Sequence, residues 1–402
     1  MGRDRRGQIS CSRPGAPRVC KTTSIREGLR LAEQNRVKIG LVGASWFADL
    51  WYLPVVQMHP DAELYAICSE GGGSARRMAD QYGIPHVFGS YEEMLERGGL
   101  DGVCIITPND VHVTIAEAAM NRGIHVMSEK PLALDLKEAG QMMLSAERSG
   151  IIHGVNFTYR EHPGVRRIKA MLSEGLIGRL QSGHFEYTGD YGVTGPPGWR
   201  GSIAKGGIGG VLADLGSHLI DLAQYVTGDG LSEVSADATF AHRDKNPDAA
   251  ADAVIFLARS EGGAQHSFRT SWMEHQGEKG QTIRMHLNGA LGIIEFAVSH
   301  LGSSLSYTLH EGGKTVVDLR EDGLPAWNED EPSSESSFRP WRLTDRNEVW
   351  KWIDRIRDRK EGTAEASADY PTFADGYYAQ AVMEAVMQAA EERRWVPIQR
   401  VK

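Results

Sequence analysis

The sequence of 402 residues is poor in cysteine and contains no long apolar run. Its four cysteines, Cys11, Cys20, Cys68 and Cys104, have the spacing neither of a disulfide framework nor of a metal site. We therefore expect free thiols and a cytoplasmic location. Nowhere does the chain approach the roughly 18 unbroken apolar residues of a membrane-spanning helix. It is therefore predicted not to enter a membrane.

An excess of positive charge is also absent. The formal net charge is -9 at pH 7. An acidic chain is not attracted electrostatically to nucleic acid or to an anionic membrane surface, so we predict neither as a partner. A small neutral or weakly charged molecule fits this charge better. The length exceeds what one hydrophobic core usually holds, which predicts about two domains.

The first part of the chain alternates between strand and helix patterns. Residues 1–36 are expected to form an arm with one short helix, and the domain proper begins at residue 37. Short apolar runs typical of buried strands lie at 37–42, 64–68, 102–107, 125–128 and 151–157, with helical patterns between them. This alternation predicts a Rossmann-type, doubly wound parallel sheet over residues 37–157.

Beyond residue 158 consecutive strands replace this alternation. Strand patterns lie at 180–187, 234–240, 253–258, 264–270, 282–287, 292–296 and 305–309, and a polar loop at 327–340 precedes helical patterns at 346–359 and 370–392. Residues 158–402 are therefore predicted to form an α+β domain, whose open and largely antiparallel sheet has helices on one face.

A glycine-bearing turn follows the first predicted strand. Gly43, Ser45 and Ala48 stand where a dinucleotide-binding fingerprint has its three glycines. Backbone N–H groups at the start of the next helix would face a pyrophosphate there. Ser45 carries a side chain where backbone should approach phosphate, so the pattern is equally consistent with a tight strand-to-helix turn.

The end of the second predicted strand bears on the choice of cofactor. Ser69 and Glu70 stand where the ribose of a dinucleotide would lie. Ser69 can accommodate a hydroxyl or a phosphate, whereas Glu70 would repel a 2′-phosphate. Arg76 and Arg77 could attract one. We therefore expect NAD and leave NADP open.

Two later strands end in polar turns at the edge of the sheet where ligands bind. Thr107-Pro108-Asn109 closes one of them, although such a tripeptide also serves as an ordinary turn and helix cap. Glu129-Lys130-Pro131 closes the next. Because proline fixes the turn, the backbone sets the direction of the lysine side chain.

Asp214 and His218 are four residues apart in a predicted helix and so share one of its faces. Oxidation of an alcohol needs a base with a pKa near neutrality, which suits His218, and a cation such as Lys130 to stabilise the developing alkoxide. The Asp214 carboxylate could fix the imidazole or hold a sugar hydroxyl. The pair could also be a plain surface pair. Only Asp221 could complete a metal site on that face, so we predict no metal.

These motifs together resemble the family of glucose-fructose oxidoreductase and inositol dehydrogenase (Gfo/Idh/MocA) over residues 37–402. The resemblance rests on Glu129-Lys130-Pro131 and on Asp214-x-x-x-His218 after the glycine-rich stretch 206–210, with support from Thr107-Pro108-Asn109-x-x-His112 and Trp199-Arg200. It implies that Lys130, Asp214 and His218 are catalytic. With the turn residues above, the predicted cofactor-binding set is Gly43, Ser45, Phe47, Ala48, Ser69, Glu70, Thr107, Pro108, Asn109, His112, Glu129, Lys130, Trp199 and Arg200.

The resemblance also places the crossing between the domains near the substrate. The predicted substrate contacts are Lys130, Tyr159, Arg160, Asp214 and His218. Aromatic faces edged by hydrogen-bonding groups suit sugar rings. Candidates in the second domain are Tyr187, Tyr191, Trp199 and Trp272.

The sequence therefore predicts an NAD(P)-dependent dehydrogenase that oxidises a secondary hydroxyl of a sugar, cyclitol or glycoside. One alternative is a glycoside hydrolase that uses bound NAD transiently. Another is a non-catalytic regulator, which retention of Lys130, Asp214 and His218 disfavours. Strand 282–287 alternates apolar and polar residues, so one face of its sheet lacks an evident cover. Relatives bury that face against another subunit, which implies a homodimer or homotetramer.

Overall fold

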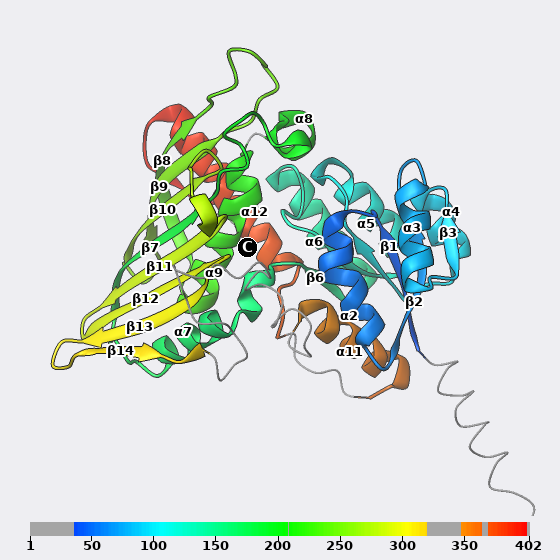
Figure 1. Ribbon diagram of the computed structural model, residues 1–402, viewed down its shortest axis with the longest axis horizontal. Helices are drawn as coiled ribbons and strands as arrows, with labels where there is room; N and C mark the ends of the chain where they lie inside the picture. The colour runs from blue at the N-terminus through cyan, green and yellow to red at the C-terminus, as the bar shows by residue number, and fades with distance from the viewer. Residues whose placement is uncertain (1–35, 208, 320–346, 364–368, 400–402) are drawn as a thin grey trace, which may run out of the picture. The chain divides into compact units, whose positions relative to one another are not determined.

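The computed structural model describes residues 36–207, 209–319, 347–363 and 369–399. The helix expected before residue 36 and the polar loop expected at 327–340 lie outside these residues. Within them, the chain from Val37 onward builds two β-sheets with their covering helices (Figure 1).

The first sheet confirms the predicted Rossmann-type topology. Its six described strands are all parallel, in the order β3-β2-β1-β4-β5-β6. They are β1 (Val37–Val42), β2 (Ala62–Cys68), β3 (His86–Phe88), β4 (Gly102–Ile105), β5 (His125–Ser128) and β6 (His153–Val155). The strand order reverses direction beside β1, so a crevice is expected at the carboxyl ends of β1 and β4.

Helices connect these strands and cover the first sheet (Figure 1). They are α2 (Leu53–Met58), α3 (Gly73–Tyr82), α4 (Tyr91–Arg97), α5 (His112–Met120), with the short η2 (Asn109–Val111) before it, and α6 (Leu136–Ser149). The helix after β1 begins with a π-helical turn, η1 (Ala48–Tyr52), which the sequence pattern did not predict. Trp51 and Tyr52, two consecutive residues of this turn, are both buried.

The second sheet confirms the predicted open and largely antiparallel arrangement. Its nine described strands have the order β14-β13-β12-β11-β7-β10-β9-β8-β15, and of their pairings only β7 with β10 is parallel. They are β7 (Leu180–Thr188), β8 (Leu231–Thr239), β9 (Ala253–Ser260), β10 (Gln265–Ser271), β11 (Thr282–Gly289), β12 (Gly292–Ser299), β13 (Gly302–Leu309), β14 (Lys314–Val317) and β15 (Val396–Pro397).

Helices lie on one face of the second sheet (Figure 1). The helical elements of this part are η3 (Thr158–Glu161), α7 (Pro163–Ser173), η4 (Gly198–Gly201), α8 (Ile203–Gly206), η5 (Leu212–Gly216), α9 (Ser217–Thr227), η6 (Gly277–Lys279) and α12 (Phe373–Glu392). Ile283, Met285 and Leu287 of β11 are buried, as their alternation predicts. Ile255 and Leu257 of β9 point the other way and are 54% and 51% exposed. No described segment covers that face.

One helix from the end of the chain lies on the first sheet. Helix α11 (Glu348–Glu361) falls within the residues predicted to form the second domain, yet it packs against α2, β1, β5 and β6 (Figure 1). Its Trp352 is fully buried, and a Cβ added to Gly102 of β4 would lie only 2.6 Å from the indole ring. Every helix in the described residues is too short or too polar to cross a membrane.

Candidate active site

The turn after β1 brings two strand ends into close contact at Gly43. Its φ is +104°, and a Cβ there would lie 2.1 Å from the carbonyl oxygen of Ile106, so only glycine fits. The Ser45 hydroxyl accepts a hydrogen bond from the backbone N–H of Ala48 at 3.4 Å. Ser45 therefore helps to begin the π-helical turn that follows.

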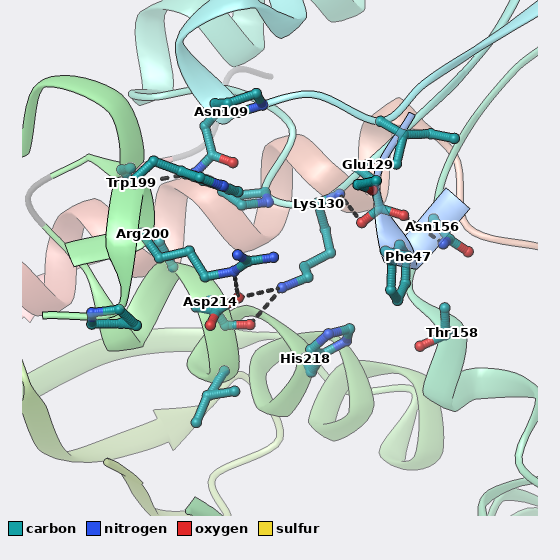
Figure 2. A pocket seen from close by; sticks show the side chains of 18 of the residues that line it. Phe47, Asn109, Glu129, Lys130, Asn156, Thr158, Trp199, Arg200, Asp214 and His218 are labelled. Carbon is teal, nitrogen blue, oxygen red and sulfur yellow. Dashed lines mark hydrogen bonds and ion pairs between the residues drawn. The ribbon is translucent and has the colours of Figure 1, made fainter. Parts of the chain in front are cut away.

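A cavity of about 640 Å³ lies at the carboxyl edge of the first sheet and is walled on its other side by the second domain (Figure 2). This volume is typical of small-molecule sites. The predicted residues that line it are Ser45, Phe47, Thr107, Pro108, Asn109, Glu129, Lys130, Tyr159, Trp199, Arg200, Asp214 and His218. The structure thus gathers the three predicted catalytic residues with most of the predicted cofactor residues.

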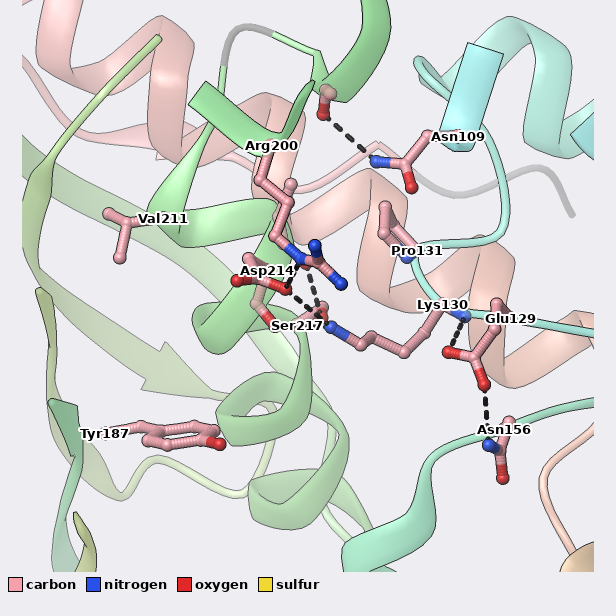
Figure 3. A network of polar contacts seen from close by, with 12 residues as sticks. Asn109, Glu129, Lys130, Pro131, Asn156, Tyr187, Arg200, Val211, Asp214 and Ser217 are labelled. Carbon is pink, nitrogen blue, oxygen red and sulfur yellow. Dashed lines mark hydrogen bonds and ion pairs between the residues drawn. The ribbon is translucent and has the colours of Figure 1, made fainter. Parts of the chain in front are cut away.

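Lys130 reaches from the first domain to Asp214 in the second (Figure 3). Its Nζ donates to the backbone oxygen of Asp214 at 2.6 Å and to Oδ1 at 3.0 Å. Oδ1 also accepts from Arg200 Nε at 3.2 Å, and Oδ2 accepts from the Tyr191 hydroxyl at 2.7 Å. Burial opposes ionisation of Asp214, but Lys130, Arg200 and the Tyr191 hydrogen bond outweigh it and hold its pKa well below the usual range.

His218 lies on α9 beside this cluster and is buried. The rings of Tyr159 and His218 form a T-shaped contact with centroids 4.9 Å apart, and within the described residues His218 Nδ1 has no hydrogen-bond partner. Burial and the positive charge of Lys130 lower the pKa of His218 well below 6.5, although Asp214 opposes this. No hydrogen bond joins Asp214 to His218 in the described residues, so the alternative in which Asp214 fixes the imidazole is not supported. The lowered pKa of His218 favours its neutral form.

Glu129 lies beside Lys130 with its carboxylate turned toward three donors. Oε1 accepts from the Tyr52 hydroxyl and from Asn156 Nδ2, each at 2.7 Å, and Oε2 accepts from the Lys130 backbone N–H at 3.2 Å. Burial raises the pKa of Glu129, while the Asn156 hydrogen bond, the Lys130 charge and the Tyr52 hydrogen bond oppose the rise. The carboxylate is thus fixed in position as part of the cavity wall.

The turn after β4 is tied both to the second domain and to the lysine turn. Asn109 Nδ2 donates to the backbone oxygen of Gly206 at 3.1 Å. The ring nitrogens of His112 lie 3.0 Å from the carbonyl oxygen of Thr107 and 3.1 Å from that of Pro131. His112 does not line the cavity. Its contacts join the turn after β4 to the lysine turn. A direct contact between His112 and the cofactor is not supported.

The predicted residues nearer the adenosine end lie outside the cavity. Gly43, Ala48, Ser69 and Glu70 are not among its lining residues, and Glu70 is exposed at the end of β2. Three buried polar atoms at strand ends lack a partner in the part of the chain that the structure describes. They are Ser69 Oγ, Thr107 Oγ1 and Asn109 Oδ1. Such orphaned groups along the ligand edge of the sheet fit the hydroxyls and amide of a bound dinucleotide.

The substrate prediction for Arg160 is not supported. Its guanidinium is buried and pairs with Asp221, and its NH2 group also donates to Asp375 at 2.7 Å. Two carboxylates therefore hold it away from the cavity, which it does not line. Trp272 is also buried elsewhere, and its Nε1 donates to Asp252 at 2.8 Å.

The predicted aromatic candidates Tyr159, Tyr187 and Tyr191 all line the cavity. The Tyr159 and Tyr187 hydroxyls lie 2.8 Å apart, and the Tyr187 hydroxyl donates to Gln281 Oε1 at 2.7 Å. Lining residues outside the predicted set include Trp46, Leu50, Trp51, Asn156, Thr158, Gln281 and His300. Gln281 and His300 flank strands and carry no motif. Trp46 and Trp51 could have been inferred from their place beside the glycine-bearing turn. No three His, Cys, Asp or Glu residues of the described chain are grouped so as to hold a metal ion.

Comparison with known proteins decides the family. The model of the oxidoreductase family with an NAD-binding Rossmann fold matches residues 37–157, and the model of the GFO/IDH/MocA C-terminal domain matches residues 165–295. The chain belongs to the Gfo/Idh/MocA family. The family that its motifs resemble is thereby confirmed.

Gfo/Idh/MocA relatives align along most of the chain. Levoglucosan dehydrogenase of Pseudarthrobacter phenanthrenivorans is 26% identical over 395 residues, 91% of this chain and 99% of its own. D-Apiose dehydrogenase of Rhizobium rhizogenes is 26% identical over 377 residues, 90% of this chain and 98% of its own. The prediction of an NAD-dependent oxidoreductase is therefore confirmed.

Solved structures share the fold. The oxidoreductase domain protein from Kribbella flavida superposes with a TM-score of 0.77 at 26% identity, covering 91% of this chain and all of that one. A levoglucosan dehydrogenase in complex with NADH and levoglucosan gives a TM-score of 0.76 at 23% identity, with 91% and 100% of the two chains covered.

Proposed function

We propose that this Gfo/Idh/MocA oxidoreductase oxidises a secondary hydroxyl of a sugar, cyclitol or glycoside by hydride transfer to NAD. The observation that carries this proposal is the meeting of Lys130, Asp214 and neutral His218 in one cavity, at the end of a Rossmann-type sheet. A base and a cation are what the removal of a hydroxyl proton requires.

NAD supplies the acceptor for the hydride. The residues that would hold its nicotinamide half are those that line the cavity on the side of the first domain, among them Phe47, Thr107, Asn109 and Glu129. Ser69 Oγ, unpartnered in the described chain, would serve its adenosine half. Arg200 lies over the ring of Trp199 at 4.4 Å, which fixes this cation at the cavity wall.

Lys130 would stabilise the negative charge that develops on the substrate oxygen. Its ammonium group has three protons, and Asp214 takes two of them through its backbone oxygen and Oδ1. One proton remains for the substrate. Because the Asp214 carboxylate is ionised and buried, it keeps Lys130 in place at the domain junction.

His218 would accept the hydroxyl proton. As the carbon–hydrogen bond breaks, its electron pair leaves as hydride, the oxygen gives its proton to the imidazole, and a carbonyl forms. The lowered pKa of His218 keeps the ring neutral and therefore able to accept this proton. Tyr159 packs edge-on against the ring and limits how it can turn.

A panel of sugars, cyclitols, anhydrosugars and glycosides, incubated with the protein and NAD, tests the proposal. We expect one NADH for each substrate oxidised and no NADH with Asp214→Asn. Release of an aglycone without net NADH would instead identify the hydrolase alternative. Binding of NAD without turnover of any compound would favour the regulator.

The cellular location remains a prediction. Cys68 and Cys104 are free and buried, which is compatible with a reducing cytoplasm. Fractionation of the source cells tests it.

A further inference from the structure

The carboxylate of Glu129 sits in a network whose hydrogen positions can be assigned. Trp51 Nε1 can only donate, and it donates to Asn156 Oδ1 at 3.2 Å. The amide nitrogen of Asn156 must then face Glu129, which it meets at 2.7 Å. Tyr52 and the backbone N–H of Lys130 complete the set of donors. Every described contact of Glu129 thus offers a hydrogen, and the ionised carboxylate matches them all.

These donors come from three segments that meet at the cavity edge. Tyr52 belongs to the π-helical turn η1, Lys130 to the turn after β5, and Asn156 to the residues after β6. Glu129 and Asn156 line the cavity, whereas Tyr52 is fully buried and does not. Tyr52 therefore acts on a ligand indirectly, through its hydrogen bond to Glu129 and through Phe47, whose ring centroid lies 6.3 Å from its own.

Glu129 differs from Asp214, the other carboxylate of the cavity, in the partners that its side chain has. The charged residues among its described lining are Glu129, Lys130, Arg200 and Asp214. Asp214 is shared between Lys130 and Arg200, at 3.0 and 3.2 Å. The side chains bonded to Glu129 are neutral, and Glu129 and Phe47 both line the cavity from the first domain (Figure 2). Lys130, whose charge acts on Glu129, is itself held by Asp214, so the field of the Glu129 carboxylate also acts on whatever occupies that part of the cavity.

The redox forms of the cofactor differ in charge at this place. The nicotinamide ring carries a positive charge in NAD⁺ and none in NADH. A fixed carboxylate in a buried site favours a nearby cation over its neutral form. We propose that Glu129 is the counter-charge of the oxidised nicotinamide and so favours NAD⁺ over NADH, and that Tyr52 and Asn156 are positioning residues for its carboxylate. The inference rests on the proposed placement of the nicotinamide in this cavity.

The test is a calorimetric titration of the protein with NAD⁺ and, separately, with NADH, without sugar, at about pH 8, where an acid of even moderately raised pKa is ionised. In Glu129→Gln we expect the ratio of the NAD⁺ to the NADH dissociation constant to rise about tenfold or more, because one charge is lost and the shape is kept. Tyr52→Phe should change the ratio in the same direction by less.

Tyr82→Phe is the matched control. The Tyr82 hydroxyl donates to Asp49 Oδ1 at 2.6 Å, an equally short tyrosine–carboxylate bond at a place that does not line the cavity. In Tyr82→Phe the ratio of the NAD⁺ to the NADH dissociation constant should stay at the wild-type value. Thermal melting identifies a variant that does not fold, and Asn156→Ala then replaces Tyr52→Phe.

If Glu129→Gln weakens the binding of both redox forms equally, or of neither, the ratio of the dissociation constants is unchanged. Either result would overturn the proposal, because Glu129 would then have no preference for the charged form. The titration contains no sugar, so its result does not depend on whether a sugar substrate is found. A failure of this inference can therefore be distinguished from a failure of the proposed function.

Discussion

At the scale of single residues, Asp214 is the point where the two domains share charge. One carboxylate accepts from Lys130, Arg200 and Tyr191. Lys130 and Arg200 both line the cavity and both pair with Asp214, whereas Tyr191 contributes a neutral hydrogen bond. Lys130 is the cation that we propose to meet the reacting oxygen.

Lys130→Met should therefore reduce turnover by about 10²- to 10³-fold while NAD affinity changes little. The variant removes the cation that stabilises the developing alkoxide and leaves the cofactor side of the cavity intact. Steady-state kinetics with an active sugar and titration with NAD measure the two effects. Lys314→Met, which removes an exposed pair with Glu295, is the control. A Lys130→Met enzyme of native activity would exclude this mechanism.

The pH dependence of sugar oxidation should carry little sign of His218 above pH 6.5. A base acts in its unprotonated form, and burial with the Lys130 charge lowers the pKa of His218 well below 6.5. Its step in activity therefore falls on the acid side of 6.5, below the range of about 6 to 8 that an unperturbed histidine would give. Rate profiles for the native enzyme and His218→Asn test this. A histidine-dependent step near pH 7 would contradict it.

The sequence could single out Lys130, Asp214 and His218, which the fold brings to one cavity, because each stands in a short motif at a strand or helix end. It could not predict their partners. Tyr191, Arg200 and Lys130 meet Asp214 from three separate segments, and only the fold brings them together. Arg160 shows the opposite case, since its place in the chain suggested a ligand contact but buried carboxylates hold it elsewhere.

At the scale of elements, the strand–helix alternation and the period of the second-domain strands predicted the type of both sheets but missed the short edge strands β3, β14 and β15. The pattern could not predict the π-helical turn η1. Its apolar residues Leu50 and Trp51, with Leu53 that follows, also fit an ordinary helix. The turn is decided by tertiary contacts, in which Trp51 binds Asn156 and Tyr52 binds Glu129.

Helix α7 begins at a histidine cap that makes it sensitive to acid. His162 Nδ1 accepts from the backbone N–H of Gly164 at 3.1 Å, and the opposite nitrogen meets Ser303 Oγ of β13 at 3.0 Å. Burial lowers the pKa of His162 to about 3. The neutral form is therefore kept in the folded protein under conditions in which the unfolded chain takes up a proton.

Between pH 6.5 and about 3 the unfolded state binds one more proton at His162, so its contribution to stability is complete above 6.5 and is lost as the pH falls. The loss is about 1.4 kcal/mol of unfolding free energy per pH unit. His162→Asn should show a shallower decline than the native protein in urea unfolding at about pH 7 and about pH 5. His310→Asn, at an exposed position, should match the native slope. Parallel curves for His162→Asn would refute the role of the cap.

At the scale of the whole molecule, the second sheet has a face that no described segment covers. Ile255 and Leu257 of β9 are about half exposed on it, and Val316 of β14 is 73% exposed. Ile255 and Leu257 are neighbours on β9, whereas Val316 lies on the edge strand β14, six strands away. Exposed apolar side chains grouped on an uncovered face can mark an interface.

We propose that two or four copies assemble through this face. Light scattering at micromolar concentration should give a dimer or tetramer, and the double variant I255E/L257E should shift it toward the monomer, because buried charges without partners oppose association. The exposed substitution Leu144→Glu on α6 is the control. A single-chain particle for the native protein would disprove the assembly.

Helix α11 makes the nucleotide-binding half discontinuous in sequence. Trp352 fills the space over Gly102 and donates to the backbone oxygen of Ile152, so a fragment of residues 37–157 would leave an apolar groove open. We expect that fragment to aggregate, and the same fragment joined by a linker to residues 347–363 to stay monodisperse in gel filtration. A monodisperse fragment without the helix would contradict this. A chimera made by one cut near residue 157 would combine the first sheet of this protein with helix α11 of a relative. The residue that the relative has at position 352 must then fit against Gly102, and this fit limits such chimeras.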